Sequence, residues 1–257
     1  MARNHILTLS CPDRVGLVAG LAKLMERHAC FIESSRTFSD PETSRFFARL
    51  VFHGPDDILP SALTEDLASL GNNLNAEWAT HPEGETVKAL LLVSKSDHCA
   101  NTLLYGARRK ELPIEVVGIV SNNETLKDNF AHWNLPWFHV PVMKDTKPEA
   151  EARLFEIIQE TGADLVVLAR YMQVLSDDAC RRLEGMCINI HHSFLPGFKG
   201  ARPYHQAHAR GVKVIGATAH YVAADLDEGP IIAQVTENID HTYTPADMIE
   251  TGRHLEG

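Results

Sequence analysis

The chain has 257 residues, of which 44% are hydrophobic and 23% are charged, which is ordinary usage for one large or two modest globular domains. Its formal charge is −10 and its longest basic run is Arg108-Arg109-Lys110, so it lacks the clustered cations that displace counterions from nucleic acid, and we expect a small substrate instead. The five cysteines are odd in number and form no C-x-x-C pair, which predicts neither a disulfide framework nor a cysteine-based zinc site.

The N-terminal segment M-A-R-N-H-I-L-T-L-S lacks the apolar core of a signal peptide. No run in the chain approaches the roughly 18 apolar residues that a membrane-spanning helix needs. We therefore expect a cytoplasmic protein that has no membrane partner.

The first third of the chain alternates between strand and helix patterns. Residues 5–10 alternate like a strand, the turn C-P-D-R-V-G (11–16) follows, and apolar residues then recur at helical spacing from Leu17 to Met25. Two strand patterns follow at 31–38 and 45–53, then a helix from about Pro60 to Leu70 and a last short strand near Trp78. These elements complete the order β-α-β-β-α-β. That order is the split βαβ of ferredoxin-like domains, and we assign residues 1–82 to it.

A polar segment, H-P-E-G-E-T (81–86), follows, and we place a linker at 83–86. Strands rich in Val, Ile and Leu then alternate with helices. The expected strands are 87–93, 114–120, 137–140, 165–168, 187–190 and 214–222, and the expected helices are 99–109, 124–133, 148–160 and one that begins at Thr244-Pro245. This alternation predicts an α/β unit with a mostly parallel sheet covered on both faces. Ligands of such sheets bind outside the carboxyl ends of the strands, where R-Y-M-Q (170–173) and N-I-H-H-S (189–193) lie.

The stretch N-I-H-H-S-F-L-P-G (189–197) places polar side chains where a buried strand is expected to end. Asn189 carries two N–H donors for a developing oxyanion, and His191 is of the one residue type whose unperturbed side-chain pKa lies near neutrality. Residues two apart in an extended segment share a side, so both could face one carbonyl. The loop A-A-D-L-D-E-G-P (223–230) offers three carboxylates to orient the imidazole or a water.

Explanations other than catalysis remain for these residues. Structural capping of the strand end accounts for Asn189 about as well as catalysis does. The loop A-D-L-D-E-G (224–229) could be a solvated turn or a cation site, although it lacks the calcium-loop pattern. His205 and His208 could ligate zinc, yet with fourteen histidines chance spacings are common. The run P-G-F-K-G (196–200) hints at an anion-binding backbone, but no phosphate-loop or dinucleotide motif follows a strand.

Two separated motifs resemble the signature of folate-dependent formyltransferases. They are I-N-I-H-H-S-F-L-P-G-F-K-G-A-R-P-Y-H-Q-A (188–207) and G-A-T-A-H-Y-V-A-A-D-L-D-E-G-P-I-I (216–232). The glycinamide ribonucleotide transformylase and methionyl-tRNA formyltransferase groups share N-x-H-x-S-x-L-P followed, at this separation, by L-D-x-G-P. The resemblance implies a catalytic trio of Asn189, His191 and Asp227, with Asp225 a neighbouring acid outside the motif position.

The same resemblance implies a Rossmann-like fold for residues 87–257 and a folate-binding site within it. The segments that hold the folate in this family correspond here to Tyr171, Met172, Gln173, Val174 and Leu175, and to the backbone at Val222, Ala223, Ala224 and Asp225. We expect the folate to be the substrate, with no cofactor and no metal.

The first domain resembles an ACT module, a ferredoxin-like family that binds small amino acids at domain interfaces. ACT ligands usually lie at the turn that corresponds here to S-C-P-D-R-V-G-L-V (10–18), so the resemblance implies an effector site at Asp13, Val15 and Gly16. We expect a homodimer or homotetramer in which the module either senses an amino acid or only joins subunits.

An ACT module in front of a formyltransferase-like domain, with H-H-S-F-L-P-G-F-K-G in place of the commoner H-P-S-L-L-P, is similar to the formyltetrahydrofolate deformylase family. The resemblance implies hydrolysis of 10-formyltetrahydrofolate to formate and tetrahydrofolate, which supplies formate for purine synthesis and balances one-carbon folate pools. Two alternatives stay open: formyl transfer to a small amine, because the same trio serves both reactions, and a catalytically decayed amino-acid-binding regulatory protein. Family members continue beyond the G-R-x-x-E region, so we expect the second domain to be short at its C-terminus.

Overall fold

The structure is a computed structural model that describes residues 3–55, 59, 61–198 and 202–257. The chain divides into two compact units, Met1–Glu85 and Thr86–Gly257. Pro60, where a helix was expected to begin, and Lys199 and Gly200 of the glycine-containing run lie outside the described residues.

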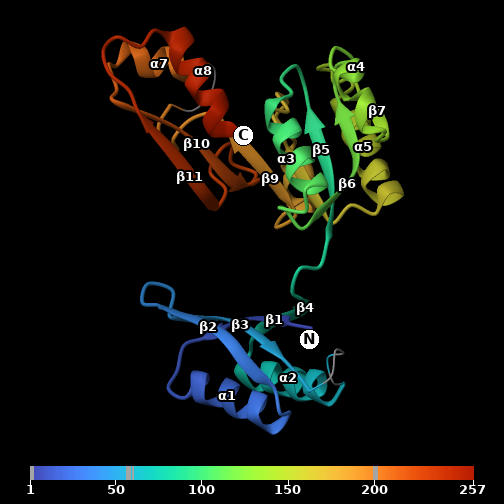
Figure 1. The fold of residues 1–257 in the computed structure, drawn as a ribbon, viewed down its shortest axis with the longest axis vertical. Helices are drawn as coiled ribbons and strands as arrows, with labels where there is room; N and C mark the ends of the chain where they lie inside the picture. Colours follow the sequence, from blue (N-terminus) through green and yellow to red (C-terminus); the bar gives the residue numbers. More distant parts are fainter. Residues whose placement is uncertain (1–2, 56–58, 60, 199–201) are drawn as a thin grey trace. The chain divides into compact units, whose positions relative to one another are not determined.

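The first unit has the β-α-β-β-α-β order expected from the sequence. Its elements are β1 (His5–Pro12), α1 (Leu17–Arg27), β2 (Phe31–Asp40), β3 (Arg45–His53), α2 (Ser61–Leu74) and β4 (Glu77–Pro82). The strands form an antiparallel sheet in the order β2-β3-β1-β4, with both helices on one face (Figure 1). Many unrelated domains share this topology, so it does not by itself single out an ACT module, and that assignment stays a prediction.

The core of the first unit lies between this sheet and its two helices. Leu7 and Phe52 point from the sheet toward Met25 on α1 and Leu63 and Leu67 on α2, and all five are buried. Alternate residues of β1 and β3 face the core, which is why the sequence alternates between apolar and polar side chains.

The second unit is an α/β structure built on a seven-stranded sheet. Its elements are β5 (Val87–Val93), α3 (His98–Arg108), β6 (Ile114–Ser121), α4 (Lys127–Phe130), a 3-10 turn (Ala131–Trp133), β7 (Trp137–His139), α5 (Lys147–Thr161), β8 (Leu165–Leu168), α6 (Asp177–Arg182), β9 (Cys187–His191), α7 (Pro203–Ala209), β10 (Val214–Tyr221), β11 (Ile231–Asn238) and α8 (Pro245–Glu256). The strand order is β11-β10-β9-β8-β5-β6-β7, and β5 to β9 are parallel while β10 and β11 are antiparallel. The order reverses at β5, so β5 and β8 flank the switch point where ligands of such sheets bind.

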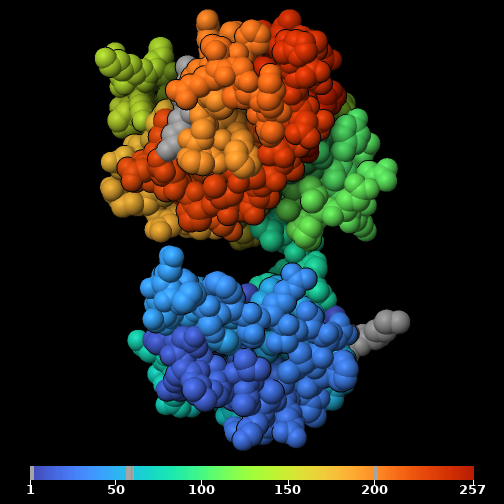
Figure 2. Space-filling view, turned by 90° about the vertical axis from the view of Figure 1, so that its left-hand side faces the viewer, coloured from blue at the N-terminus to red at the C-terminus, as the bar shows by residue number. Residues whose placement is uncertain are grey.

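Both faces of the parallel strands are buried. Leu90 and Leu92 of β5 pack toward one face together with α5, whereas Leu91 and Val93 pack toward the other face together with α3. An uninterrupted apolar strand such as A-L-L-L-V (89–93) is stable only in this position, because neither side of it meets water. Figure 2 shows that the last part of the chain, coloured orange to red, makes up much of one side of this unit.

Several expectations about the second unit need correction. The helix expected at 124–133 begins later and is less regular than predicted: Lys127–Phe130 is α-helical and Ala131–Trp133 is a 3-10 helix. Asn123 Oδ1 accepts a hydrogen bond from the backbone N–H of Thr125 (2.8 Å) and holds the residues before Lys127 in a turn. The short helix α6 and the edge strand β11 were not predicted. The helix expected at Thr244 is present, and the Thr244 hydroxyl and the Asp247 carboxylate form a capping box at its start.

All five cysteines are unpaired and buried, as their number and spacing predict. Among the described residues, none of the helices combines the length and apolar character needed to cross a membrane.

Candidate active site

Two anchors fix the segment that follows β8, which was expected to hold a folate. The backbone N–H of Met172 donates to Ser94 Oγ, directly after β5 (3.0 Å). Farther along, Glu151 on α5 accepts hydrogen bonds from the backbone N–H and the hydroxyl of Ser176 (2.7 and 2.6 Å), and Ser176 also caps α6. The side chains of Met172 and Val174 between these anchors are more than half exposed. The segment is therefore a fixed backbone that presents apolar side chains to a cavity.

The strand β9 and its neighbour β10 bring further polar side chains to the same place. Asn189 and His191 line one cavity, as their two-residue spacing in an extended strand predicts. The register of the antiparallel pair places His220 opposite Asn189 and Thr218 opposite His191. The Thr218 hydroxyl donates to the backbone carbonyl of Ser193 (2.8 Å), so β10 also anchors the loop that follows β9.

The loop 222–230 leaves β10 and turns back so that Asp227 reaches His191. Asp227 Oδ1 lies 3.3 Å from His191 Nδ1, and the two side chains are only 8% and 6% exposed. Asp227 has a φ of 58°, in the left-handed region that Asp tolerates better than most residues. Gly229 follows because a Cβ at this position would collide with the carbonyl oxygen of Tyr221. The backbone path around the carboxylate thus accounts for the glycine of D-E-G.

Hydrogen bonding sets the charge and the tautomer of this pair. Donation from His191 Nδ1–H holds the pKa of the Asp227 carboxyl below its usual value, against the opposing effect of burial. The carboxylate is therefore charged at neutral pH. Among the described residues, no group forms a hydrogen bond with the buried Nε2 of His191, so its lone pair is available to a molecule in the cavity.

His220 was missed in the sequence analysis and orients Asn189. Its Nδ1–H donates to the backbone carbonyl of Tyr221 (2.9 Å), which leaves Nε2 as an acceptor for the side-chain amide of Asn189 (3.1 Å). This contact fixes which end of the amide is the NH₂ group, and the second N–H has no hydrogen-bond partner among the residues that the structure describes. The sequence signal was a histidine within the apolar strand 214–222, where a buried imidazole requires polar partners.

The side chains described above surround a cavity of about 330 Å³, a size that suits a small organic ligand. All three expected catalytic residues line it, and so do all the expected folate-binding residues except Asp225, which is exposed. The lining consists of Leu168, Arg170, Tyr171, Met172, Gln173, Val174, Leu175, Cys180, Asn189, Ile190, His191, His192, His220, Val222, Ala223, Ala224, Leu226 and Asp227. Asp227 rather than Asp225 is thus the carboxylate of this cavity.

A second group of polar side chains lies beside the cavity. Glu256 on α8 accepts hydrogen bonds from His98 Nε2 (2.9 Å) and the Tyr204 hydroxyl (3.2 Å), and its carboxylate lies 3.4 Å from Arg170 Nε. Burial, the largest single effect, raises the pKa of Glu256, but the hydrogen bond from His98 and the charge of Arg170 outweigh it and hold this pKa below its usual value. Burial, with a further contribution from Arg170, lowers the pKa of His192 to about 4, so this histidine is neutral at pH 7.

The described residues offer poor support for a resident metal. His205 and His208 are exposed on α7. The donor atoms of His98, Cys99 and Glu256 do lie within 4.8 Å of one another, but burial raises the pKa of the Cys99 thiol to about 12 and so keeps it protonated. The neighbouring Arg170 guanidinium also opposes a cation, so this donor set fits a hydrogen-bonded cluster better than a metal centre.

The residues expected to bind an effector lie in the first unit, in the turn between β1 and α1. Asp13, Val15 and Gly16 are all exposed, and the backbone N–H of Asp13 donates to the carbonyl of Ser44 (2.9 Å). Gly16 is the N-cap of α1 with a φ of 93°, a conformation that favours glycine. The turn is therefore a fixed and accessible backbone feature.

Comparison with known proteins connects this site to a family. Residues 87–257 match the family model described as formyl transferase. A formyltetrahydrofolate deformylase from Corynebacterium sp. (strain P-1) is 47% identical over 256 residues, which covers 98% of this chain and 89% of that protein.

Solved structures give the same result. The crystal structure of a formyltetrahydrofolate deformylase from Burkholderia mallei has a TM-score of 0.92 and 48% identity, covering 99% of this chain and 90% of that one. A glycinamide ribonucleotide transformylase from Symbiobacterium toebii has a TM-score of 0.62 and 30% identity, but it covers only 68% of this chain and 84% of its own. The likeness to the deformylases thus extends over both units.

Proposed function

Because the chain belongs to the formyltetrahydrofolate deformylase family, we infer that it hydrolyses 10-formyltetrahydrofolate to formate and tetrahydrofolate. The observation that carries this inference is the match over 98% of the chain to a deformylase, together with a cavity that the family's motif residues line. Formyl transfer to an amine and a decayed regulatory protein are less favoured, because the likeness to a transformylase covers 68% of the chain and the trio is intact.

In the proposed reaction, water adds to the formyl carbon and the bond from that carbon to the folate nitrogen breaks. The unused N–H of Asn189 donates to the formyl oxygen as negative charge develops on it. His191 Nε2 takes a proton from the attacking water and returns it to the departing nitrogen. Asp227 positions the water and stabilises the imidazolium that forms meanwhile.

His220 supports this chemistry as a positioning residue. It holds the Asn189 amide through Nε2, so the donor is oriented before the substrate arrives. A donor that needs no reorientation stabilises a developing charge more strongly than one that must turn. We place the folate rings against the segment 171–175 and the backbone of 222–225, which two hydrogen-bonded anchors and the β10 register hold in place.

The direct test is to measure formate and tetrahydrofolate released from 10-formyltetrahydrofolate by purified, metal-depleted protein. We expect equal amounts of both products without an amine acceptor. Product that forms only when an acceptor such as glycinamide ribonucleotide is added would assign a transferase instead. Activity that is lost on metal removal and restored by zinc would contradict the metal-independent mechanism, whose support is the hydrogen-bonded donor set of His98, Cys99 and Glu256.

For the first unit we propose a regulatory role, with a small amino acid bound at Asp13, Val15 and Gly16 in a homodimer or homotetramer. The support is the accessible backbone turn at the start of α1. An effector must favour one arrangement of the enzyme to change its rate. Titration with common amino acids should shift the rate or the thermal midpoint, and light scattering should give the mass of a dimer or tetramer. We also propose that the formate formed feeds purine synthesis.

A further inference from the structure

The sheet of the first unit has a second face on which neither of its two helices packs. The helices α1 and α2 pack on one face, and the alternate side chains of the four strands project from the other. Phe38 on β2 and Phe47 on β3 belong to this uncovered face and are 61% and 40% exposed. Burying such aromatic rings against a ligand is favourable, because apolar surface leaves water.

Two arginines lie opposite each other on this face. The register of β2 and β3 pairs Arg36 with Arg49, and both side chains are exposed. Among the described residues, neither arginine has an ion pair or a side-chain hydrogen bond, whereas Arg27 of the same unit pairs with Asp66. Like charges directly opposite on neighbouring strands destabilise a sheet. An anion bound to both guanidinium groups would remove that repulsion.

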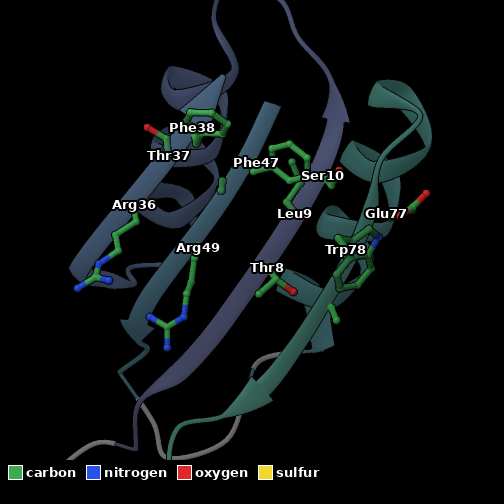
Figure 3. A pocket seen from close by; sticks show the side chains of 12 residues that line it. Thr8, Leu9, Ser10, Arg36, Thr37, Phe38, Phe47, Arg49, Glu77 and Trp78 are labelled. Carbon is green, nitrogen blue, oxygen red and sulfur yellow. The ribbon is translucent and has the colours of Figure 1, made fainter. Parts of the chain in front are cut away.

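An aromatic pair adjoins the arginine pair. Phe38 is opposite Phe47 one row farther along the same two strands, and their ring centroids are 6.4 Å apart with an interplanar angle of 27°. Figure 3 shows both pairs on the same face, with Thr8 and Ser10 on the neighbouring strand β1. These residues line an open hollow of about 550 Å³. The hollow thus combines two cations with an apolar platform and two hydroxyl groups.

We propose that this hollow, named here the β-face site, binds an aromatic carboxylate: a flat ring with one or two carboxylate groups. The guanidinium fork matches a carboxylate with two parallel hydrogen bonds, and the ring stacks on Phe38 and Phe47. Phosphate fits less well, because strand pairing uses the backbone N–H groups and leaves no helix N-terminus or backbone nest at this face. The β-face site contains none of the residues Asp13, Val15 and Gly16 of the effector turn.

A simple amino acid is a poorer match for the β-face site. Its ammonium group requires a carboxylate partner, and Glu77 is the one acidic residue among those that line the hollow. Glu77 is already 3.9 Å from Arg45, which reduces its capacity to hold a second cation. The excess of positive charge at the β-face site therefore selects an anion over a zwitterion.

The test is isothermal titration of the full chain with N-(4-aminobenzoyl)-L-glutamate, a probe with one ring and two carboxylates. We expect saturable binding that the double variant Arg36→Gln/Arg49→Gln weakens about tenfold or more, because both charge-assisted contacts are lost. The control Arg14→Gln/Lys23→Gln removes the same charge from the same unit and should retain the wild-type affinity.

Three results would overturn the proposal. The first is equal affinity for the wild type and Arg36→Gln/Arg49→Gln, with circular dichroism showing that the variant is folded. The second is glutamate binding as tightly as the aromatic probe, which would remove the role of the phenylalanines. The third is a smaller oligomer for Arg36→Gln/Arg49→Gln than for the wild type in light scattering. That result would show that the face binds a second copy of the chain instead of an aromatic carboxylate.

Discussion

Two buried polar clusters of the second unit differ in how their carboxylates are used. In the cavity cluster, Asp227 contacts His191, and the nearby Asn189 is held by His220. In the Glu256 cluster, a single carboxylate has three partners, namely His98, Tyr204 and Arg170. Among the described residues, the Nε2 of His191 and one N–H of Asn189 have no hydrogen-bond partner, while Glu256 uses its oxygens within the protein. In the Glu256 cluster, only Arg170, which also lines the cavity, has buried donors (Nε and Nη1) without such a partner in the part of the chain that the structure describes.

The comparison indicates what separates a reactive cluster from a structural one. Hydrogen-bonding capacity that is left unused in a buried position costs stability, and at the wall of a cavity a bound ligand can complete it. The Glu256 cluster instead joins α8 to the residues beside the cavity. Arg170 connects the two, because it pairs with Glu256 and also lines the cavity. Mutations in the two clusters should therefore affect different quantities.

Asn189→Ala should give the largest loss of activity. Removing one oxyanion donor typically lowers kcat about 10²–10³-fold, or roughly 3–4 kcal/mol. Binding of a folate analogue and the thermal midpoint should change little, because the amide acts mainly on the developing charge. Steady-state formate release checks the rate, and a kcat close to that of the wild type would remove Asn189 from the mechanism.

Asp227→Asn should lower kcat about 10²-fold, because it removes the charge that stabilises the imidazolium and preserves the shape. The matched control is Asp225→Asn, two residues away and exposed, which should leave kcat nearly unchanged. If Asp225→Asn caused the larger loss, the assignment of the carboxylate would be reversed. Comparing the two variants in one assay isolates the role of position from that of charge.

Glu256→Gln should instead reduce the free energy of unfolding, by about 2–3 kcal/mol, because it leaves the largely buried Arg170 guanidinium without a counter-charge. Its kcat, corrected for the folded fraction, should fall far less than that of Asn189→Ala. Glu250→Gln on the same helix is the control, since Glu250 is exposed. Urea unfolding measures the free energy of unfolding of both variants. A Glu256→Gln protein as stable as the control would show that this cluster is not structural.

The smallest effect concerns pH and His192, which lies between the clusters. Its pKa of about 4 in the folded state is below the ordinary value of 6.5, so the unfolded chain binds more protons between these values. The contribution of neutral His192 to the free energy of unfolding is therefore fully present above about pH 6.5 and is lost as the pH falls toward 4. At pH 5 the free energy of unfolding should be lower by about 1–2 kcal/mol. Urea midpoints at pH 7.5 and 5 should differ less in His192→Gln than in the wild type. Equal differences would contradict the neutral state of His192.

Much of this architecture followed from local patterns in the sequence. Period-two alternation in the first unit and continuous apolar strands in the second each reflect which faces are buried, so they predict strand type before any contact is known. Asn189 and His191 were found together because side chains two apart on a strand share a side. The pattern failed at the start of the helix expected at 124–133, where the Asn123 side chain competes with helix formation.

Other features depend on segments that are distant in sequence. Asp225 and Asp227 have identical side chains. The return of the loop 222–230 brings the carboxylate of Asp227, and not that of Asp225, to His191. The role of His220 depends on its register opposite Asn189, 31 residues away. Local spacing specifies which way a side chain points on its own element, so the sequence by itself determined the strands, the helices and the candidate residues. Which groups meet is decided by strand pairing and loop paths, which only the tertiary structure contains.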